Sequence, residues 1–488
     1  MMTLAQINLE IARPEIGLLI FTFVLMVFDL FSKKVYRAGV LFCGAIVGLV
    51  LTIVSVFHTL GDLVAGAPQY AFSNMFVVDQ MSTVLKIALL ASVAVLIIYS
   101  RDYLEKRKLF TGEFMLLLLF ATLGMMVMVS ANHFVTLYLG LEILALSTYA
   151  MVALNRDSAV STEAAMKYFI LGALASGMLL YGMSMIYGAT GTLDVSAIAK
   201  SIEFSRANAP LISFGLVFVV AGLAFKLGVV PFHMWVPDVY QGAPTPMTLF
   251  IGSASKIAAF GFTVRILGDA LAGATGEWQS MLVILAVASL AVGNIIAIAQ
   301  TNIKRMLAYS TISHMGFLLL GILAGSKEGY AASMFYIVSY SLMSLGAFGV
   351  IMLLSREGFE ADNIDDLKGL NTRSPWVAFL MLTMMFSMAG IPPFIGFFAK
   401  LAVLEAVLQV GYTWLVVYAV VMSVIGAYYY LRIVKLMYMD EPLDTNPIVA
   451  RKTMRVALGV NALAVLLLGL VPGIGLMGLC LNAVQRSL

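Results

Sequence analysis

The chain has 488 residues, of which 61% are hydrophobic and 11% are charged, and its formal net charge is only +3. Its mean hydropathy of +0.99 excludes a water-soluble domain of this length. The composition predicts an all-α polytopic membrane protein, in which each crossing of a hydrocarbon core about 30 Å thick takes roughly 20 apolar residues.

Fourteen apolar stretches along the chain are long enough to cross a membrane. They lie at 14–31, 39–60, 76–100, 113–130, 133–154, 163–188, 210–236, 244–267, 278–299, 304–324, 329–354, 376–408, 411–437 and 453–477. The connections between them are too short to bury a core of their own. The first stretch has no basic leader and no small-residue cleavage site, so we expect it to remain as a span.

Lysine and arginine are distributed unevenly over the connections. The connections after odd-numbered stretches hold Lys33, Lys34, Arg37, Arg101, Lys106, Arg107, Lys108, Arg156, Lys304, Arg305, Arg356, Lys368, Arg373, Arg432, Lys435, Arg451, Lys452 and Arg455. The other side holds Arg13, Lys200, Arg206, Lys327 and Arg486, with Arg265 at a helix end. The positive-inside rule therefore predicts that the first set is cytoplasmic and that both termini are periplasmic.

The sequence offers no site for a bound redox group or nucleotide. It contains no Walker loop and no Rossmann glycine fingerprint, and its two cysteines cannot hold an iron–sulfur cluster. Cys43 and Cys480 both lie in apolar helical segments, where buried packing is the expected role. We expect no metal and no cofactor in this chain, so any redox or nucleotide chemistry belongs to partner proteins.

The order of the stretches suggests an inverted duplication. Stretches 4–8 and 9–13 form two groups of five, and a five-helix unit that is repeated crosses the membrane upside down the second time. Prolines interrupt the corresponding seventh and twelfth stretches, at Pro231 and within 390–393, which predicts discontinuous helices there. The predicted domains are 1–112 with three helices, 113–267 and 268–437 with five helices each, and 438–488 with the last loop and helix.

Three lysines, Lys226, Lys256 and Lys400, lie inside these apolar stretches. A cation at bilayer depth is costly, so such residues usually face a partner or a wet cavity, and lysine exchanges its proton more readily than arginine. An interrupted helix frees carbonyls that would solvate an ammonium such as that of Lys226 or Lys400. The alternative is an ordinary proline kink beside a snorkelling lysine. Lys256 lies about 15 Å inside its helix, too deep to snorkel.

Glu142 is the acidic residue that matches these lysines, roughly 14 Å inside the fifth stretch. A Glu142–Lys226 pair whose separation changes would take up and release a proton, because a buried lysine binds its proton according to its nearest carboxylate. A static ion pair that only holds helices together is the alternative, and the charges alone do not separate the two interpretations.

Two further lysines lie closer to the ends of their helices. Lys167 follows Glu163 by four positions, so it forms either a surface ion pair or a link between Glu142 and Lys226. Lys86 lies near the start of the third stretch, and we interpret it as a snorkelling residue.

Two histidines are secondary candidates for proton transfer, because imidazole titrates near neutral pH. His233 follows Lys226 by seven residues, across Pro231, and His314 lies two turns into the tenth stretch. The alternative for each is a structural histidine held by hydrogen bonds. The position of His233 beside an interruption and a lysine favours function.

Three runs of residues resemble the proton-antiporter-like membrane subunits of respiratory complex I. They are FKLGVVPFHMWVPDVYQGAPTPMTLFIGSASKIAAFGF at 225–262, QTNIKRMLAYSTISHMG at 300–316 and AGIPPFIGFFAK at 389–400. Within that family the chain resembles the N type, the homologue of mitochondrial subunit 2. Its PDVYQGAP run differs from that of the L and M types, Lys400 stands where the M type has a glutamate, and the chain ends soon after helix 14.

The resemblance implies a fold of fourteen helices with inverted repeats, and it implies roles for individual residues. Glu142 would be the glutamate of helix 5, and Lys226 the lysine of helix 7 that it modulates. Lys256 would be the central relay of helix 8, and Lys400 the lysine of helix 12 at the exit to the outer side. Lys167 also resembles a family position.

The function that the resemblance implies is proton translocation by a subunit of a bacterial NADH:quinone oxidoreductase in the inner (plasma) membrane. The implied partners are the lipid bilayer, the other membrane subunits, and a hydrophilic arm that carries FMN and iron–sulfur clusters and uses NADH and quinone. No nucleic acid is implied. The alternatives are a subunit of a multi-subunit sodium/proton antiporter and a structural membrane subunit without its own proton path.

Overall fold

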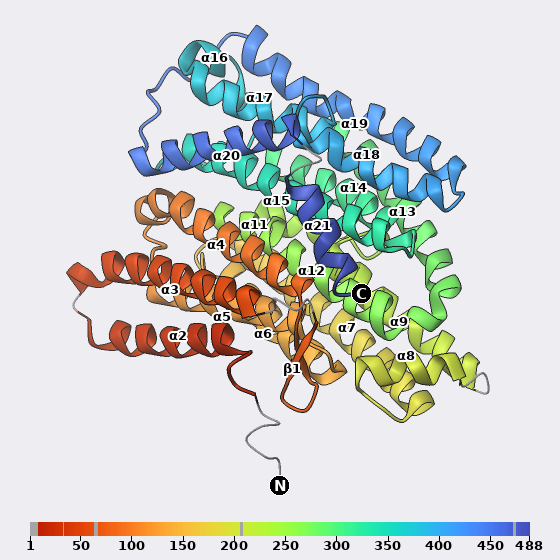
Figure 1. The fold of residues 1–488 in the computed structure, drawn as a ribbon. Coiled ribbons are helices and arrows are strands. Elements are labelled where there is room, and N and C mark those ends of the chain that lie inside the picture. The colour runs from red at the N-terminus through yellow and green to blue at the C-terminus, as the bar shows by residue number, and fades with distance from the viewer. Residues whose placement is uncertain (1–7, 33, 63–66, 205–207, 472–474) are drawn as a thin grey trace.

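The computed structural model describes residues 8–32, 34–62, 67–204, 208–471 and 475–488. The chain is built almost wholly of helices that run side by side across the molecule (Figure 1). Lys33 and Arg206, two of the basic residues used to predict the topology, lie outside the described residues.

The first half of the chain contains three N-terminal helices, a small hairpin and the helices up to the eighth crossing. Their bounds are α2 (Arg13–Phe31), α3 (Lys34–Asp62), β1 (Gln69–Ala71), β2 (Phe76–Val78), α4 (Gln80–Lys106), α5 (Gly112–Ser130), α6 (Phe134–Val152), α7 (Ala159–Thr190), α8 (Val195–Phe204), α9 (Ala209–Leu227), α10 (Trp235–Gly242), α11 (Thr245–Gly252), α12 (Ala254–Thr263), the π-helix η2 (Val264–Ala270) and the 3-10 helix η3 (Ala272–Ala274).

The second half contains the helices from the ninth crossing to the end of the chain. Their bounds are α13 (Thr275–Ile298), α14 (Ile303–Leu323), α15 (Lys327–Leu354), the 3-10 helix η4 (Ile364–Leu367), α16 (Leu370–Arg373), α17 (Pro375–Ala389), α18 (Ile395–Gln409), α19 (Thr413–Met439), α20 (Lys452–Leu470) and α21 (Leu476–Gln485).

Thirteen helices in the described part of the chain are long and apolar enough to cross a membrane. They correspond to thirteen of the fourteen predicted stretches. The remaining stretch, 376–408, is divided into α17 and α18, each shorter than a full crossing. The prediction of an all-α protein with about fourteen crossings and discontinuous helices 7 and 12 is therefore confirmed.

Two helix boundaries differ from the prediction. The stretch 76–100 begins in β2, which pairs antiparallel with β1, and α4 starts only at Gln80. Asp79 fixes that start, because its carboxylate accepts a 2.8 Å hydrogen bond from the Ser82 amide while its own amide donates to Ser82 Oγ. The last predicted stretch, 453–477, ends earlier than expected, since α20 stops at Leu470 and α21 follows as a separate helix.

Hydrogen bonds and ion pairs between connections sort the loops into two groups. One group, which we call the basic end, is joined by the pairs Arg107–Glu360, Asn302–Asp362, Arg373–Asp444 and Arg451–Asp102. The other group, the opposite end, is joined by Phe134–Leu193, Val195–Asn132 and Met81–Ser487. The connections that the charge count assigned to one side of the membrane thus lie together in the structure.

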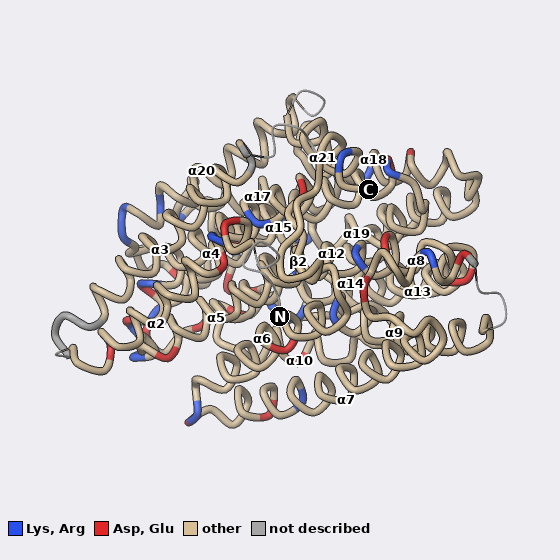
Figure 2. Tube along the Cα trace, turned by 60° about the horizontal axis from the view of Figure 1, so that its bottom comes forward, with Lys and Arg blue, Asp and Glu red and all other residues tan. Residues whose placement is uncertain are grey.

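The centre of the molecule is formed by the eighth, tenth and eleventh crossings. The spans Thr245–Ala270 and Ile303–Leu323 are buried along their whole apolar windows, whereas the window of Thr413–Met439 is only 28% buried. Charged residues occur inside this bundle as well as at its ends (Figure 2). Any buried charge in the centre must therefore be satisfied by other parts of the protein.

The two interrupted helices end in the same way. Gly228 follows α9 with φ +77° and Gly390 follows α17 with φ +88°, a left-handed conformation that glycine adopts without a side-chain clash. In both, the amide after the glycine bonds a carbonyl five positions back at 3.0 Å, which is the Schellman closure. Helix α9 runs towards the basic end and α17 runs away from it, as an inverted repeat requires.

A third interruption, which the sequence analysis did not predict, divides the eighth crossing between α11 and α12. Ser253 lies at the junction with φ −122° and ψ −89°, and its Oγ donates a 2.6 Å hydrogen bond to the carbonyl of Leu249. Such Gly-Ser pairs are a common cause of helix kinks, because the serine hydroxyl competes for the backbone carbonyl. Lys256 consequently lies in the first turn of α12.

The interpretation of Lys86 as a snorkelling residue is wrong. Its side chain is 2% exposed, and Nζ lies 2.6 Å from Glu15 Oε1 on α2. This ion pair is the one polar contact of the Glu15 carboxylate among the described residues. Lys86 cannot reach water because α2 covers it. The nearby Asp79 instead pairs with Arg265 at 2.5 Å.

This pair predicts that Lys86→Met destabilises the protein strongly. The substitution leaves the Glu15 charge buried without a partner, a change that typically costs about 3–5 kcal/mol. The measurement is the thermal unfolding midpoint of the purified assembly. Lys106→Met, on the exposed end of the same helix, is the matched control, and Lys86→Met combined with Glu15→Leu should recover most of the loss. Equal midpoints for Lys86→Met and Lys106→Met would contradict the assignment.

Candidate functional site

Lys256 from α12 satisfies the free end of α9. Its Nζ donates to the carbonyl oxygens of Leu227 at 2.7 Å and of Lys226 at 3.2 Å. Trp235 Nε1 donates to the carbonyl of Phe225 at 3.0 Å. Together with the closure at Gly228, these contacts satisfy the last four carbonyls of α9.

The sequence predicts that the freed end of α9 solvates the ammonium of Lys226. The structure places the Lys226 ammonium elsewhere and brings Lys256 to that end from another helix. The Lys256 ammonium also lies 5.2 Å from the centre of the Trp235 ring. Lys256 is 1% exposed, so these contacts replace its hydration.

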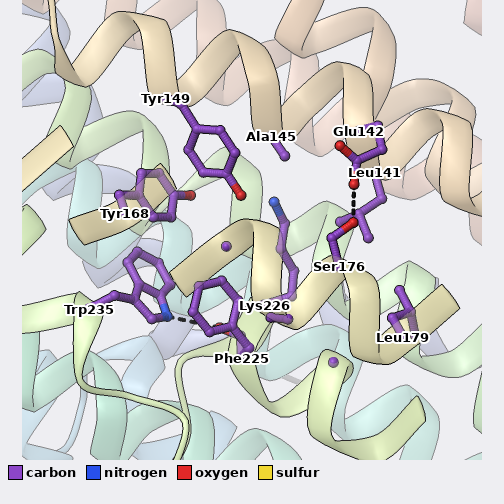
Figure 3. A pocket seen from close by; sticks show the side chains of 13 residues that line it. Leu141, Glu142, Ala145, Tyr149, Tyr168, Ser176, Leu179, Phe225, Lys226 and Trp235 are labelled. Carbon is purple, nitrogen blue, oxygen red and sulfur yellow. Dashed lines mark hydrogen bonds between the residues drawn. The ribbon is translucent and has the colours of Figure 1, made fainter. Parts of the chain in front are cut away.

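Glu142 and Lys226 face a common pocket between α6, α7 and α9 (Figure 3). The Glu142 carboxylate accepts a hydrogen bond from Ser176 Oγ, which also lies 3.1 Å from Tyr138 OH. The Lys226 side chain points towards Tyr149 and Glu142 but makes no ion pair with any described residue. The cavity volume is about 20 Å³, enough for roughly one water molecule. The two predicted partners therefore line one small cavity without forming an ion pair.

Aromatic side chains form one wall of this pocket. Tyr168 stacks on Trp235 with ring centroids 4.7 Å apart, and Tyr149 meets Tyr168 edge-on at 4.7 Å. Trp235 lines this pocket and also lies 5.2 Å from the Lys256 ammonium, so the aromatic wall contacts the surroundings of both lysines.

Lys167 lies outside the pocket of Glu142 and Lys226. Its Nζ is 2.8 Å from Glu163 and 2.7 Å from Asp238, which also pairs with Arg305 at 2.7 Å. These four side chains line a separate cavity of about 170 Å³ at the basic end. Lys167 and Ser176 are nine residues apart on α7, about 13 Å along the helix axis. The geometry thus matches the surface pair rather than a direct link.

His233 lies in the irregular segment between α9 and α10. Its Nδ1 is buried and makes no hydrogen bond within the part of the chain that the structure describes. A buried ring nitrogen without a protein partner usually contacts water. This is compatible with a role in proton transfer, which remains a prediction.

His314 is held between two tyrosines in the centre of the second half. Its Nδ1 lies 2.7 Å from Tyr336 OH on α15, and its Nε2 lies 3.0 Å from Tyr430 OH on α19. Tyr430 also hydrogen-bonds Ser310, one turn before His314 on α14. Both ring nitrogens are therefore engaged, and the histidine joins three helices.

Two unpaired hydroxyls lie between Lys256 and the region of His314 and its tyrosine partners. Tyr240 OH and Ser344 Oγ are buried and make no hydrogen bond to a described residue. Both lie beside Gly252, one turn before Lys256, where an added Cβ would come within 3.2 and 3.4 Å of them. Tyr340, one turn before Ser344, packs against the histidine ring with centroids 5.0 Å apart. Buried hydroxyls of this kind are suitable partners for bridging water.

Lys400 donates to a carbonyl at the end of α17, as Lys256 does at the end of α9. Its Nζ donates to the carbonyl of Ala389 at 2.9 Å and to Ser423 Oγ on α19 at 2.9 Å, and it lies 5.2 Å from the Phe317 ring. The side chain therefore reaches back to the helix interruption, which excludes the snorkelling alternative.

Sequence reasoning missed the hydroxyl-bearing members of the site. Tyr336 and Tyr340 are four positions apart on one helix face, a signal that was available. Nothing in the sequence distinguished Ser176, Ser423 or Tyr430 from many similar residues. In the described ranges no group of three or more His, Cys, Asp or Glu side chains is placed to hold a metal ion.

Comparisons with known proteins show which family and which fold the chain resembles. Residues 131–426 match the family model described as NADH:quinone oxidoreductase/Mrp antiporter, TM. The chain is 59% identical over 479 residues to NADH-quinone oxidoreductase subunit N of Nitrosomonas europaea, covering 98% of each protein. A chain of respiratory complex I from Thermus thermophilus is 31% identical with a TM-score of 0.81, covering 95% of this chain and 98% of that one. A chain of the Mrp complex from Dietzia sp. DQ12-45-1b has a TM-score of 0.85, covering 98% and 97%, but at 20% identity it is similar in fold alone.

The contacts of Lys256 predict a structural effect of Lys256→Met. Two buried carbonyls of α9 lose their donor, and each unsatisfied buried group costs about 1–3 kcal/mol. The thermal unfolding midpoint of the purified assembly should fall clearly. Thr263→Val on the same helix, which removes only a local bond to the carbonyl of Ala259, is the control. A midpoint for Lys256→Met that equals that of the control would show that the carbonyls are satisfied in another way.

Proposed function

The chain belongs to the family of NADH-quinone oxidoreductase subunit N, and we propose that Glu142, Lys226, Lys256 and Lys400 carry protons through it. It is an antiporter-like membrane subunit of respiratory complex I, a proton-pumping oxidoreductase. The proton path is driven by electron transfer in other subunits.

One observation carries the assignment of these residues. Lys226, Lys256 and Lys400 are buried or partly buried, and none makes an ion pair with a carboxylate in the described part of the chain. A static structural pair would hold both charges in contact. A lysine that only carbonyls, hydroxyls or water solvate can lose and regain its proton, which arginine does not do.

The proposed order of transfer follows the contacts. A water molecule in the small cavity connects Glu142 with Lys226, and the proton then passes to Lys256, whose ammonium also lies near Trp235. Such a water-mediated step needs only hydrogen-bond distances between successive groups.

The second part of the path crosses the centre. Beside Lys256, the buried hydroxyls of Tyr240 and Ser344 hydrogen-bond water molecules, and these water molecules take up the proton from Lys256. His314, with its two tyrosine partners, connects this region towards Lys400. Lys400 is the last lysine on the path.

The direction across the membrane follows from the charges. We propose that the basic end is cytoplasmic and that both termini are periplasmic, by the positive-inside rule. The cavity lined by Glu163, Lys167, Asp238 and Arg305 is then open to the cytoplasm and gathers protons for the first half. Lys167 acts there as an auxiliary group, and His233 acts as another one in the segment between α9 and α10. The protein is placed in the bacterial inner membrane.

The path divides between the two proposed repeats. Residues 113–267 hold Glu142, Lys226 and Lys256, and residues 268–437 hold His314 and Lys400. Residues 1–112 and 438–488 flank them. The interruptions at Gly228 and Gly390, with opposite chain directions, support this division.

The remaining chemistry is assigned to partners. FMN, iron–sulfur clusters, NADH and quinone belong to other subunits of the complex, which supply the driving force. This chain contributes no redox step and supplies positions at which a proton is held.

Lys226→Ala tests the proposal directly. Proton translocation by the assembled complex should fall about 10-fold or more, because a positioned proton-transfer group contributes on the order of 10²–10⁴. Assembly, quinone reduction and proton translocation are measured together in native membranes. Lys435→Ala, an exposed lysine at the basic end, is the control. If Lys226→Ala assembles and pumps normally, Lys226 has only a structural role and the proposal is wrong.

The antiporter alternative is tested by purification. The chain should copurify with an arm that contains flavin and iron–sulfur clusters. Reproducible absence of that arm, together with sodium-dependent proton exchange, would favour a sodium/proton antiporter.

Tyr336→Phe tests the central part of the path. The variant removes the hydroxyl that lies 2.7 Å from His314 Nδ1 but keeps the ring. Pumping should fall several-fold with assembly unchanged, a loss of about 1 kcal/mol or more for one hydrogen bond. Tyr428→Phe, an exposed tyrosine on α19, should pump normally. If both variants pump alike, the proton does not pass through the Tyr336–His314 contact.

A further inference from the structure

We propose that a groove between α15, α17 and α20 at the basic end binds one anionic phospholipid, independently of the proton path. Its phosphate would contact Arg373 and Arg455, and an acyl chain would lie along Leu380 and Leu458. This groove shares no residue with the pocket of Glu142 and Lys226.

The groove is a formed cavity. Its volume is about 280 Å³, and the three helices around it pack against one another. Arg373, Trp376 and Arg455 line it together with the apolar side chains of Leu353, Leu380 and Leu458. A ligand that fits this lining must have both a charged and an apolar part.

The polar and apolar parts of the lining lie at different depths. Arg373 is the last residue of α16, just before α17 begins at Pro375, and Arg455 lies in the first turn of α20. Leu458 lies about one turn, or roughly 5 Å, beyond Arg455, and Leu380 lies five positions, or roughly 7 Å, beyond the start of α17. The guanidinium groups thus lie at the helix ends of the basic end, and the leucines lie further along the apolar helices. A phospholipid has the same arrangement, with a charged headgroup at one end and apolar acyl chains beyond it.

The charge balance of the groove is positive. Asp444 is the carboxylate that contacts Arg373, at 3.1 Å, and it is shared with Arg356 at 2.8 Å. Arg455 donates to the carbonyl of Ile448 at 2.7 Å and makes no ion pair with a described residue. Its remaining N–H groups are available for a phosphate, which guanidinium binds with two parallel hydrogen bonds.

Trp376 marks the level of the groove in the membrane. Its side chain is 51% exposed and stacks on Phe379 with ring centroids 5.9 Å apart. Tryptophan is enriched at the interface between headgroups and hydrocarbon, and basic pockets between helices on the cytoplasmic side are suited to anionic headgroups. A free phosphate would leave the apolar half of the groove uncovered, so the structure favours the lipid.

The test uses the purified complex in proteoliposomes that contain a phospholipid with a photoreactive diazirine in its acyl chain. After illumination, mass spectrometry locates adducts in the segments around Leu380 and Leu458. A phosphatidylglycerol probe should label these segments about fivefold or more above a phosphatidylcholine probe, since each basic side chain contributes about 1 kcal/mol. Unlabelled phosphatidylglycerol should compete, and inorganic phosphate should not.

Variants identify the residues responsible. Arg455→Gln should lower the preference for phosphatidylglycerol severalfold, Arg455→Lys should keep most of it, and Lys435→Gln, a basic residue outside the groove, should not change it. If Arg455→Gln fails to assemble, the unaltered complex and Arg455→Lys still give the result.

Three outcomes would overturn the proposal. Equal labelling by the two probes would mean that the groove does not recognise charge. Competition by inorganic phosphate would mean that it binds a free anion. Absence of lipid adducts, with crosslinks from this face to another subunit, would mean that a protein covers the groove.

Discussion

The backbone ends of interrupted helices are the constraint on which the site depends. Inside a membrane a carbonyl without a hydrogen bond costs several kcal/mol, so a helix can stop there only if other groups satisfy its last turn. Here glycine closures satisfy part of each end, and an ammonium from another helix satisfies the rest, from Lys256 at α9 and from Lys400 at α17. The same contacts lower the free-energy cost of burying the lysines, because carbonyls replace the water around each charge.

The packing of the bundle separates two kinds of buried charge. Lys86–Glu15 and Arg265–Asp79 are close ion pairs at 2.6 and 2.5 Å, which hold α2 and the π-helix against α4. Lys226, Lys256 and Lys400 lack such carboxylates in the described part of the chain. A close pair keeps both charges fixed, whereas a lysine that donates only to carbonyls and hydroxyls has no carboxylate that holds its charge. This difference distinguishes the site from the structural charges around it.

Several features of the fold and the site were predictable from local patterns. The crossings follow from apolar length, the discontinuous helices from Pro231 and Pro392-Pro393, and the grouping of connections from their lysines and arginines. Other features were wrong or missed. Lys86 was taken for a snorkelling residue, Lys226 for the group at the end of α9, and the kink at Ser253 was not foreseen. Each of these three features depends on which neighbouring helix covers the residue. The periodic pattern of the sequence does not contain that information.

The sequence by itself determined the membrane class, the order of the crossings, the places where two helices stop and the residue types that can hold a proton. It did so because bilayer thickness, proline and buried charge act through composition and spacing along the chain. Only the tertiary structure decided that Lys256 meets α9, that Glu142 and Lys226 line one small cavity, and that His314 lies between Tyr336 and Tyr430. These are contacts between helices distant in sequence, fixed by the joint packing of the whole bundle.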